Sequence, residues 1–215
     1  MRTLLLIGLL YATAATNINA NAGDFIIVND DYAVLEVWYG GTVLPKDIAR
    51  WQYIAKRANG RVIKLTINSG GGSAYAGIEL YWLMERYPRL QTVAGKAYGA
   101  WSAAAVMWLA GDIRTIEPGG GQVFFHAAYC DWDPEPPVDI GCDTSVIQMF
   151  FADVWEDAGL DGLRFNEWLD VVQTKMGTDG WIGITETGWH LYCSTSDLSL
   201  PFTPTEFGGG HVVSY

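Results

Sequence analysis

The chain has 215 residues, of which 50% are hydrophobic and 13% aromatic. This composition excludes an intrinsically disordered protein, and the length suits one domain with a sizeable core rather than two. Because 24 acidic residues stand against 13 basic ones, the formal net charge is -11 at pH 7. An acidic surface of this kind repels phosphate backbones, so we expect no nucleic-acid partner.

The first 22 residues have the features of a secretory signal peptide. Arg2 precedes the apolar run TLLLIGLLYATAA, and the polar stretch after it contains Ala20-Asn21-Ala22. This A-x-A pattern predicts cleavage after Ala22 or, alternatively, after Ala20. An uncleaved anchor is the other interpretation, although the apolar run is short for a membrane span. We therefore expect a secreted or periplasmic protein with no membrane span after signal cleavage.

Residues 23–193 alternate between strand and helix patterns. Strands are expected at 25–28, 33–40, 61–67, 90–95, 113–117 and 122–127, and helices at 45–58, 74–87 and 102–109. This alternation predicts βαβ units and a mainly parallel sheet in one α/β domain. Residues 144–175 are expected to form a C-terminal helical portion, with breaks near Gly159 and Gly162. Residues 194–215, rich in Ser, Thr, Pro and Gly, are expected to be a loosely structured tail.

Three cysteines fit an oxidising compartment. Cys130 and Cys142 flank the proline-containing loop DWDPEPPVDIG and could close it as a disulfide, which would leave Cys193 over. Three single pairings are open, and the sequence does not choose among them. The Cys and His spacings do not match a structural zinc site, so no metal is expected.

Two short segments contain residue types suited to acyl-transfer chemistry. In INSGGGS (67–73), three glycines separate a strand from a helix, so backbone amides could approach a phosphate or an oxyanion closely. A P-loop is excluded because no Gly-Lys-Ser/Thr follows, and a plain tight turn is the alternative. In AYGAWSAAA (97–105), Ser102 is either a nucleophile with small neighbours or a spacer in a buried helix.

Taken together, INSGGGSAYAG, GKAYGAWSAAAVMWLAG and VFFHAA resemble the Clp-type serine peptidases over residues 60–128. In that family Ile-Asn-Ser-Pro-Gly-Gly precedes a Ser in a small-residue helix ending in Ala-Gly, and a His follows. Here Ser102 lies 9 residues before Gly111, and His126 lies 24 residues after Ser102. Gly77 matches an Ala-Gly pair in the first helix of the family. Gly70 replaces the proline of the family motif, and Trp101 stands directly before the serine.

The resemblance implies a Clp/crotonase-like fold of repeated ββα units and a Ser-His-Asp triad. Ser102 would be the nucleophile and His126 the general base, because a serine hydroxyl needs an adjacent base to lose its proton. The orienting carboxylate would be Asp179 in MGTDGWIGITETGW, followed by a short strand and a helix that begins at Thr185-Glu186.

The same resemblance implies an oxyanion hole made by the backbone amides of Gly72 and Ala103. It also implies a peptide or unfolded-protein substrate, no cofactor and a homo-oligomer, with stacked rings as in the family. The insertion CDWDPEPPVDIGC stands where the family has its handle helix. His190, which we expect in a helix, and His211 in the tail are interpreted as structural or surface residues.

Three functional hypotheses remain open. The first is an extracytoplasmic serine endopeptidase that acts without ATP, and the second is a catalytically inactive Clp-like binding or assembly module. The third is a crotonase-type enzyme acting on an acyl thioester. The related signal peptide peptidase A family uses a Ser-Lys dyad, for which Lys175 is the available lysine downstream of Ser102. A hydrolase requires His126 Nε2 within hydrogen-bond reach of Ser102 Oγ.

Overall fold

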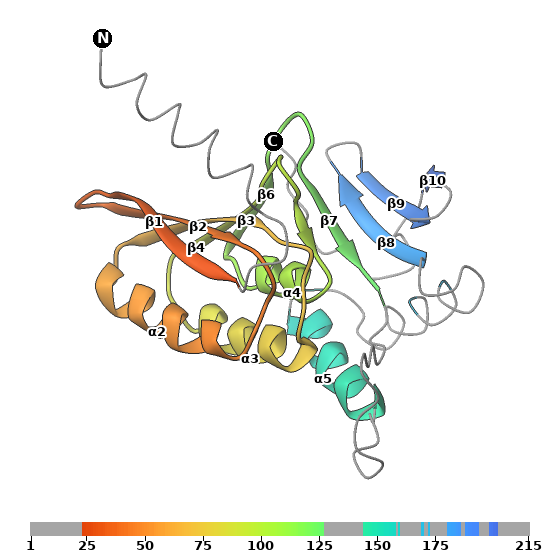
Figure 1. The fold of residues 1–215 in the computed structure, drawn as a ribbon, viewed down its shortest axis with the longest axis horizontal. Helices are drawn as coiled ribbons and strands as arrows, with labels where there is room; N and C mark the ends of the chain where they lie inside the picture. Colours follow the sequence, from red (N-terminus) through yellow and green to blue (C-terminus); the bar gives the residue numbers. More distant parts are fainter. Residues whose placement is uncertain are drawn as a thin grey trace.

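The structure, a computed structural model, describes residues 23–126, 144–157, 159, 169, 172, 180–185, 188–193 and 198–201. These residues form a mixed α/β fold with two sheets and four helices (Figure 1). The strands are β1 (Asp24–Asp30), β2 (Val34–Gly40), β3 (Val62–Asn68), β4 (Leu90–Ala94), β5 (Ala100–Trp101), β6 (Ile113–Ile116), β7 (Gln122–Phe125), β8 (Gly180–Thr185), β9 (Gly188–Cys193) and β10 (Leu198–Pro201). The helices are α2 (Lys46–Ala58), α3 (Ala74–Glu85), α4 (Ala103–Leu109) and α5 (Thr144–Asp157).

The first sheet has the strand order β1-β2-β3-β4-β6 and is mostly parallel. Strand β1 pairs with β2 antiparallel, and the other three neighbouring pairs are parallel. Helices α2 and α3 lie against one face of this sheet, where they connect successive parallel strands (Figure 1). Parallel strands require such crossovers, and a helix is the usual way to make one. The mainly parallel sheet expected from the alternating pattern is therefore present.

The second sheet has the order β10-β9-β8-β7-β5 and differs in its connections. Strands β5 and β7 are parallel, whereas β7, β8, β9 and β10 pair antiparallel. The two sheets meet at an isolated parallel bridge between Ser69, directly after β3, and Ala100 in β5. The end of β3 is thereby joined to the strand that precedes Ser102.

Helix α2 forms where the sequence pattern predicts a helix. Trp51, Ile54 and Ala58 recur at helical spacing and are buried against the sheet. Asn59 ends the helix in the left-handed conformation, with φ 51°, and its N–H donates to Ala55 O at 3.3 Å. An Asn at this position is a common helix stop because it tolerates positive φ.

Helix α3 packs closely against α4 at a glycine. A Cβ on Gly77 would lie 2.9 Å from Ala103 Cβ and 3.0 Å from Ala103 O, so no larger residue fits there without displacement. Helix α4 is buried along its whole length, and Trp108 within it is fully buried. Thr92 Oγ1 in β4 donates to Trp108 O at 2.6 Å, which ties the first sheet to α4. The start of α4 is thus fixed by its packing.

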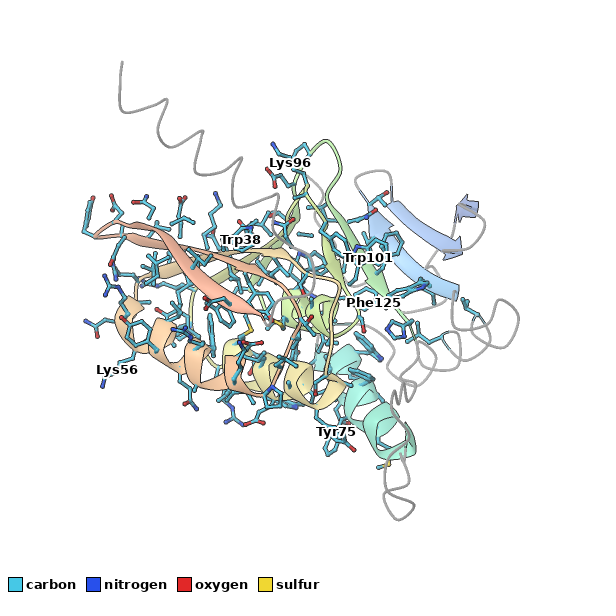
Figure 2. All side chains as sticks on the ribbon, viewed as in Figure 1. Trp38, Lys56, Tyr75, Lys96, Trp101 and Phe125 are labelled. Carbon is cyan, nitrogen blue, oxygen red and sulfur yellow. The ribbon has the colours of Figure 1, made fainter. Side chains whose placement is uncertain are left out.

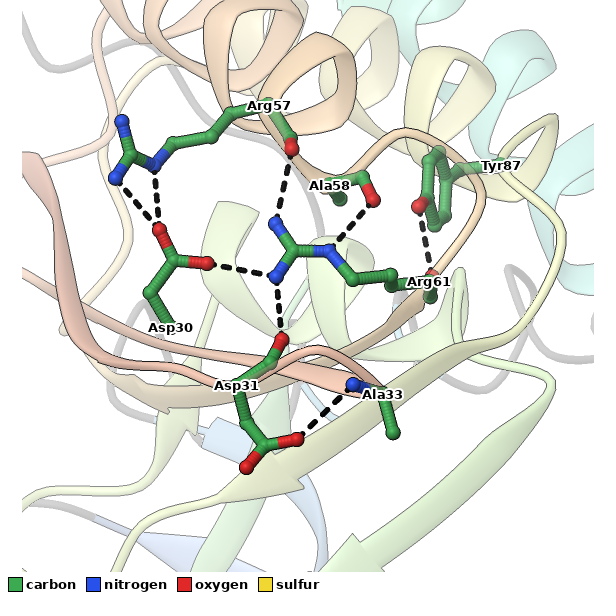
Figure 3. Close-up of polar contacts among 7 residues, drawn as sticks. All are labelled: Asp30, Asp31, Ala33, Arg57, Ala58, Arg61 and Tyr87. Atoms are coloured by element: carbon green, nitrogen blue, oxygen red, sulfur yellow. Dashed lines mark hydrogen bonds and ion pairs between the residues drawn. The ribbon is translucent and has the colours of Figure 1, made fainter.

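A charged cluster lies at the end of the first sheet where β3 begins, opposite the end where Ser69 follows β3 (Figure 3). Asp30 accepts hydrogen bonds from Arg57 Nε at 2.9 Å and from Arg61 Nη1 at 2.7 Å. Arg61 Nη1 also donates to Asp31 O, and Tyr87 Oη donates to Arg61 O at 2.7 Å. Hydrogen bonds from Arg61 and Arg57 hold the pKa of the Asp30 carboxyl below its usual value. The cluster joins the β1–β2 turn to the C-terminal end of α2.

Two segments differ from the sequence-based expectations. Residues 188–193, expected within a helix beginning at Thr185-Glu186, form strand β9 paired with β8. Residues 198–201 form β10 against β9, inside the expected loose tail. In both cases cross-strand pairing decides the structure, and pairing between neighbouring strands is not visible in local periodicity. Helix α5 confirms the helical pattern from residue 144 as far as Asp157.

Candidate active site

Ser102 and His126 both follow the carboxyl ends of neighbouring parallel strands. Ser102 comes directly after β5 and His126 directly after β7, with Trp101 paired to Phe124 in the ladder. Carboxyl ends of parallel strands lie at the same edge of a sheet, so the two side chains emerge together. His126 Nε2 lies 2.6 Å from Ser102 Oγ, and both residues are partly exposed. The structure therefore joins a hydroxyl and an imidazole that are 24 residues apart in the chain.

The backbone at Ser102 is strained. Its φ is 54° and its ψ is -126°, a combination that residues with a Cβ rarely adopt. Such a conformation costs on the order of 1–3 kcal/mol and persists only where surrounding contacts impose it. Here Ser102 N–H donates to Phe124 O at 2.8 Å, while Ala105 N–H donates to Ser102 O at 2.9 Å. The sharp turn from β5 into α4 presents Oγ at the edge of the sheet, as at a nucleophile elbow.

The glycine turn after β3 contacts Ser102. A Cβ on Gly71 would stand 2.5 Å from Ser102 Cβ, 2.7 Å from Trp101 O and 3.0 Å from Ala103 N. Gly71 also has φ 94°, so two independent reasons favour glycine at this position. The amide nitrogen of Ala103 and the glycine turn therefore lie on the same side of Ser102.

Gly72 belongs to a segment that is hydrogen-bonded to Val43. Val43 N–H donates to Gly71 O at 2.8 Å, and Ser73 N–H donates to Val43 O at 2.9 Å. These bonds make the parallel bridge between Val43 and Gly72. In such a bridge Val43 bonds to the residues before and after Gly72. The N–H of Gly72 therefore points away from Val43.

Ser69 is a positioning residue that the sequence analysis did not single out. It is fully buried, and its Oγ donates to Gly41 O at 2.5 Å and accepts from Gly71 N–H at 3.1 Å. Its backbone accepts from Trp101 N–H at 3.0 Å. Ser69 thus connects the glycine turn to the strand before Ser102. The feature of the sequence that could have pointed to Ser69 is its place as a polar residue directly after an apolar strand.

The side chain of Trp101 lies in an aromatic cluster. Its ring contacts Phe124 at a centroid distance of 4.8 Å, Trp181 at 5.4 Å and Tyr98 at 5.5 Å. Figure 2 places Trp101 beside β7 on the side of β8, whereas Phe125 points toward α5. The ring of Trp101 is thus packed between β7 and β8, where Trp181 also contacts His126.

Trp181 in β8 contacts His126. Its ring centroid lies 4.3 Å from that of His126, with the two planes inclined at 57°. Ile182, the next residue, pairs with Phe125 in the ladder between β7 and β8. The indole therefore covers one face of the imidazole, which limits the ring orientations open to His126. Asp179 stands two positions before Trp181 in the chain and lies outside the described residues.

Most of the other residues named from the sequence lie outside the part of the chain that the structure describes. They are Cys130, Cys142, Lys175 and His211. His190 lies in β9, opposite Gly183 of β8, rather than in a helix. Within the described ranges, no group of three or more His, Cys, Asp or Glu side chains could hold a metal ion.

Comparison of the sequence with known proteins gives no match to a family model or to a curated protein. None of the helices in the described part of the chain is long and apolar enough to cross a membrane.

Proposed function

We propose that this chain is a serine endopeptidase of the Clp/crotonase-like fold that hydrolyses peptide bonds outside the cytoplasm without ATP. The observation that carries the proposal is the 2.6 Å separation between His126 Nε2 and Ser102 Oγ at the ends of two parallel strands. A hydroxyl and an imidazole in this arrangement form the nucleophile–base pair of acyl-transfer enzymes. The strained backbone of Ser102 is a second support, since such strain concentrates at functional sites.

The reaction would proceed through an acyl-enzyme. His126 Nε2 takes the proton of Ser102 Oγ as the oxygen attacks the peptide carbonyl carbon, and the C–N bond then breaks when the imidazolium returns that proton to the leaving amine. A water molecule, deprotonated by the same nitrogen, next attacks the ester carbonyl and releases Ser102. This sequence requires the tautomer of His126 that carries its proton on Nδ1. In the proposal the Asp179 carboxylate accepts that Nδ1–H.

Negative charge on the carbonyl oxygen would be stabilised by two backbone amides. Ala103 opens α4, so its N–H is among the first amides of the helix and has no carbonyl partner within it. Gly72 directs its N–H away from Val43, as the bridge requires, and in the proposal this N–H meets the oxyanion beside Ser102. Loss of one such donor typically lowers the rate about a hundredfold or more. The glycines keep the segment close enough for both amides to meet one oxygen.

Covalent labelling tests the proposal. The mature protein is treated with a fluorophosphonate probe, and the modified peptide is identified by mass spectrometry. We expect a single adduct on Ser102, no adduct on Ser102→Ala, and hydrolysis of unstructured peptides by the wild-type chain only. An adduct that persists in Ser102→Ala would refute the assignment. A folded wild-type chain that neither reacts with the probe nor cleaves peptides would favour the inactive binding or assembly module instead.

A further inference from the structure

A buried carboxylate outside the candidate active site lacks a partner on one oxygen. Asp47, in the first turn of α2, is fully buried. Its Oδ2 accepts hydrogen bonds from Tyr39 Oη at 2.9 Å and from Leu44 N–H at 2.8 Å. Its Oδ1 is buried and has no hydrogen-bond partner. An unsatisfied carboxylate oxygen in the interior is costly, so this group points to a missing donor.

Gly23 lies against the same carboxylate. It is buried, and a Cβ on it would stand 2.7 Å from Asp47 Oδ2 and 2.1 Å from Tyr39 Oη, so only glycine fits. Its backbone N–H donates to Thr42 O at 2.7 Å. The nitrogen and the missing Cβ are both about 1.5 Å from Cα, which places the nitrogen within roughly 5 Å of Oδ2. Opposite charges at such a separation interact strongly.

Gly23 is also the residue after the expected signal cleavage site Ala20-Asn21-Ala22. We propose that hydrolysis of the Ala22–Gly23 bond creates an α-ammonium at Gly23 that forms a buried ion pair with Asp47. In that step, catalysed by an export-processing peptidase, water adds across the amide. Ala22 leaves as a carboxylate, and Gly23 N becomes an ammonium with three N–H groups. One N–H keeps its bond to Thr42 O, and the others become available to Asp47.

The environment of Asp47 before cleavage of the Ala22–Gly23 bond also supports the ion pair. Burial raises the pKa of the Asp47 carboxyl although its hydrogen bonds and the charge of Lys46 lower it, so the interior still disfavours the charged form. Tyr39 Oη and Leu44 N–H account for Oδ2, as in an ordinary stabilised helix start. They account neither for the bare Oδ1 nor for the glycine pressed against the carboxylate. A terminal ammonium at position 23 explains both features.

The ion pair would also affect the candidate active site through the segment of Thr42 and Val43. Thr42, which accepts from Gly23, is followed by Val43, whose backbone bonds to Gly71 and Ser73. A Cβ on Gly72 would contact Val43 O at 2.5 Å and Thr42 Cγ2 at 2.8 Å, so the two segments are tightly fitted. Ordering residues 23 and 42 therefore orders the glycine turn beside Ser102. This consequence for reactivity rests on the proposed function, whereas the ion pair does not.

The first experiment determines the natural N-terminus. The full chain is produced in an exporting host, and the mass of the exported protein is measured. We expect a chain that begins at Gly23. A chain that begins at Asn21, as cleavage after Ala20 would give, overturns the proposal because its ammonium would lie two residues away from Asp47.

The second experiment compares the Tm values of two chains, one beginning at Gly23 and one at Ala22. Each is produced as a fusion protein and released by cleavage at its first residue. We expect the Gly23 chain to have a Tm higher by about 4 °C, because only its ammonium lies beside Asp47. In Asp47→Asn the two starts should have equal Tm values. Equal Tm values in the wild-type background overturn the ion pair. The same comparison in Ser102→Ala should give the same shift, because the ion pair does not depend on catalysis.

A chemical measurement keeps the test decisive if Asp47→Asn does not fold. The α-amine of each wild-type start is modified with an amine-reactive reagent at pH 7, and the rate is followed by peptide mass. We expect the amine of Gly23 to react at least tenfold more slowly than that of the Ala22 chain, and equal rates overturn the proposal. Fluorophosphonate labelling of Ser102 should be faster in the Gly23 chain. Equal labelling rates would overturn the link to Ser102.

Discussion

The two sheets contribute to the candidate site in different ways. The first sheet, in which β3 lies between the parallel strands β2 and β4, supplies only backbone: the turn of residues 69–72 at the end of β3. The second sheet supplies both reactive side chains, Ser102 after β5 and His126 after β7. The bridge between Ser69 and Ala100 joins the two. Changes within the strands of the first sheet should therefore alter stability alone, and changes in its turn should alter stability and reactivity together. Changes at the edge of the second sheet should alter reactivity at nearly constant stability.

The largest expected effect is on reactivity. His126→Gln removes the base beside Ser102 Oγ, so fluorophosphonate labelling of Ser102 should slow by a factor of about 10² to 10⁴. The Tm should change little, because His126 is partly exposed at the end of its strand. The matched control is His190→Gln on β9, which should label at the wild-type rate. Unchanged labelling in His126→Gln would contradict the division between the sheets.

The next effect tests the close approach of the glycine turn to Ser102. Gly71→Ala places a Cβ 2.5 Å from Ser102 Cβ at φ 94°, so we expect about 3 kcal/mol of destabilisation and loss of labelling. Gly60→Ala is the control, because φ is 79° there and nothing lies within 4 Å of the added Cβ. It should cost only about 1 kcal/mol. Urea unfolding measures both, and equal losses would show that the turn does not press on Ser102.

A change inside the first sheet should affect stability alone. Thr92→Val removes the fully buried hydroxyl that donates to Trp108 O and leaves that carbonyl with the longer bond from Gly111 N–H at 3.4 Å. We expect a loss of about 1–2 kcal/mol in the free energy of unfolding, with labelling of Ser102 at the wild-type rate. The measurement is urea unfolding together with probe kinetics. Slower labelling in a fully folded Thr92→Val would show that the helix after Ser102 transmits changes from β4 to the site.

The strained serine offers a smaller effect of the opposite sign. Ser102→Gly should be about 1 kcal/mol more stable than Ser102→Ala, because glycine adopts φ 54° and ψ -126° without a Cβ clash. Both variants lack the nucleophile, so neither should react with the probe. Thermal unfolding of the two variants checks the difference. If Ser102→Ala were the more stable, the strain would be absent in solution.

The smallest effect concerns the charged cluster at the far end of the first sheet. Hydrogen bonds from Arg61 and Arg57 lower the pKa of Asp30, so its stabilising contribution is complete above the ordinary carboxyl pKa of about 4. That contribution disappears as the pH falls through the lower, folded-state pKa. The Tm of wild type should therefore exceed that of Asp30→Asn at pH 6, and the gap should narrow below about pH 4. A gap independent of pH would refute the ion-pair explanation.

Local patterns were sufficient to predict most of the first sheet. The buried stripe of α2, its stop at Asn59 and the strand of residues 62–68 all follow from periodicity and turn chemistry. The pattern failed at residues 188–193, which were expected in a helix and form β9. Pairing with β8 decides that segment, and Trp181 of β8 reaches His126 through the same hairpin. Ser69 was overlooked because its role depends on contacts with residues far away in the chain.

From the order of amino acids alone came the candidate residues: a serine among small neighbours, a histidine after an apolar strand and a glycine turn. Only the tertiary structure decided that Ser102 Oγ and His126 Nε2 are 2.6 Å apart, and that Asp47 faces Gly23 in the interior. The physical reason is that residue type and spacing determine local conformation. Proximity between distant residues instead depends on which strands pair and in which register.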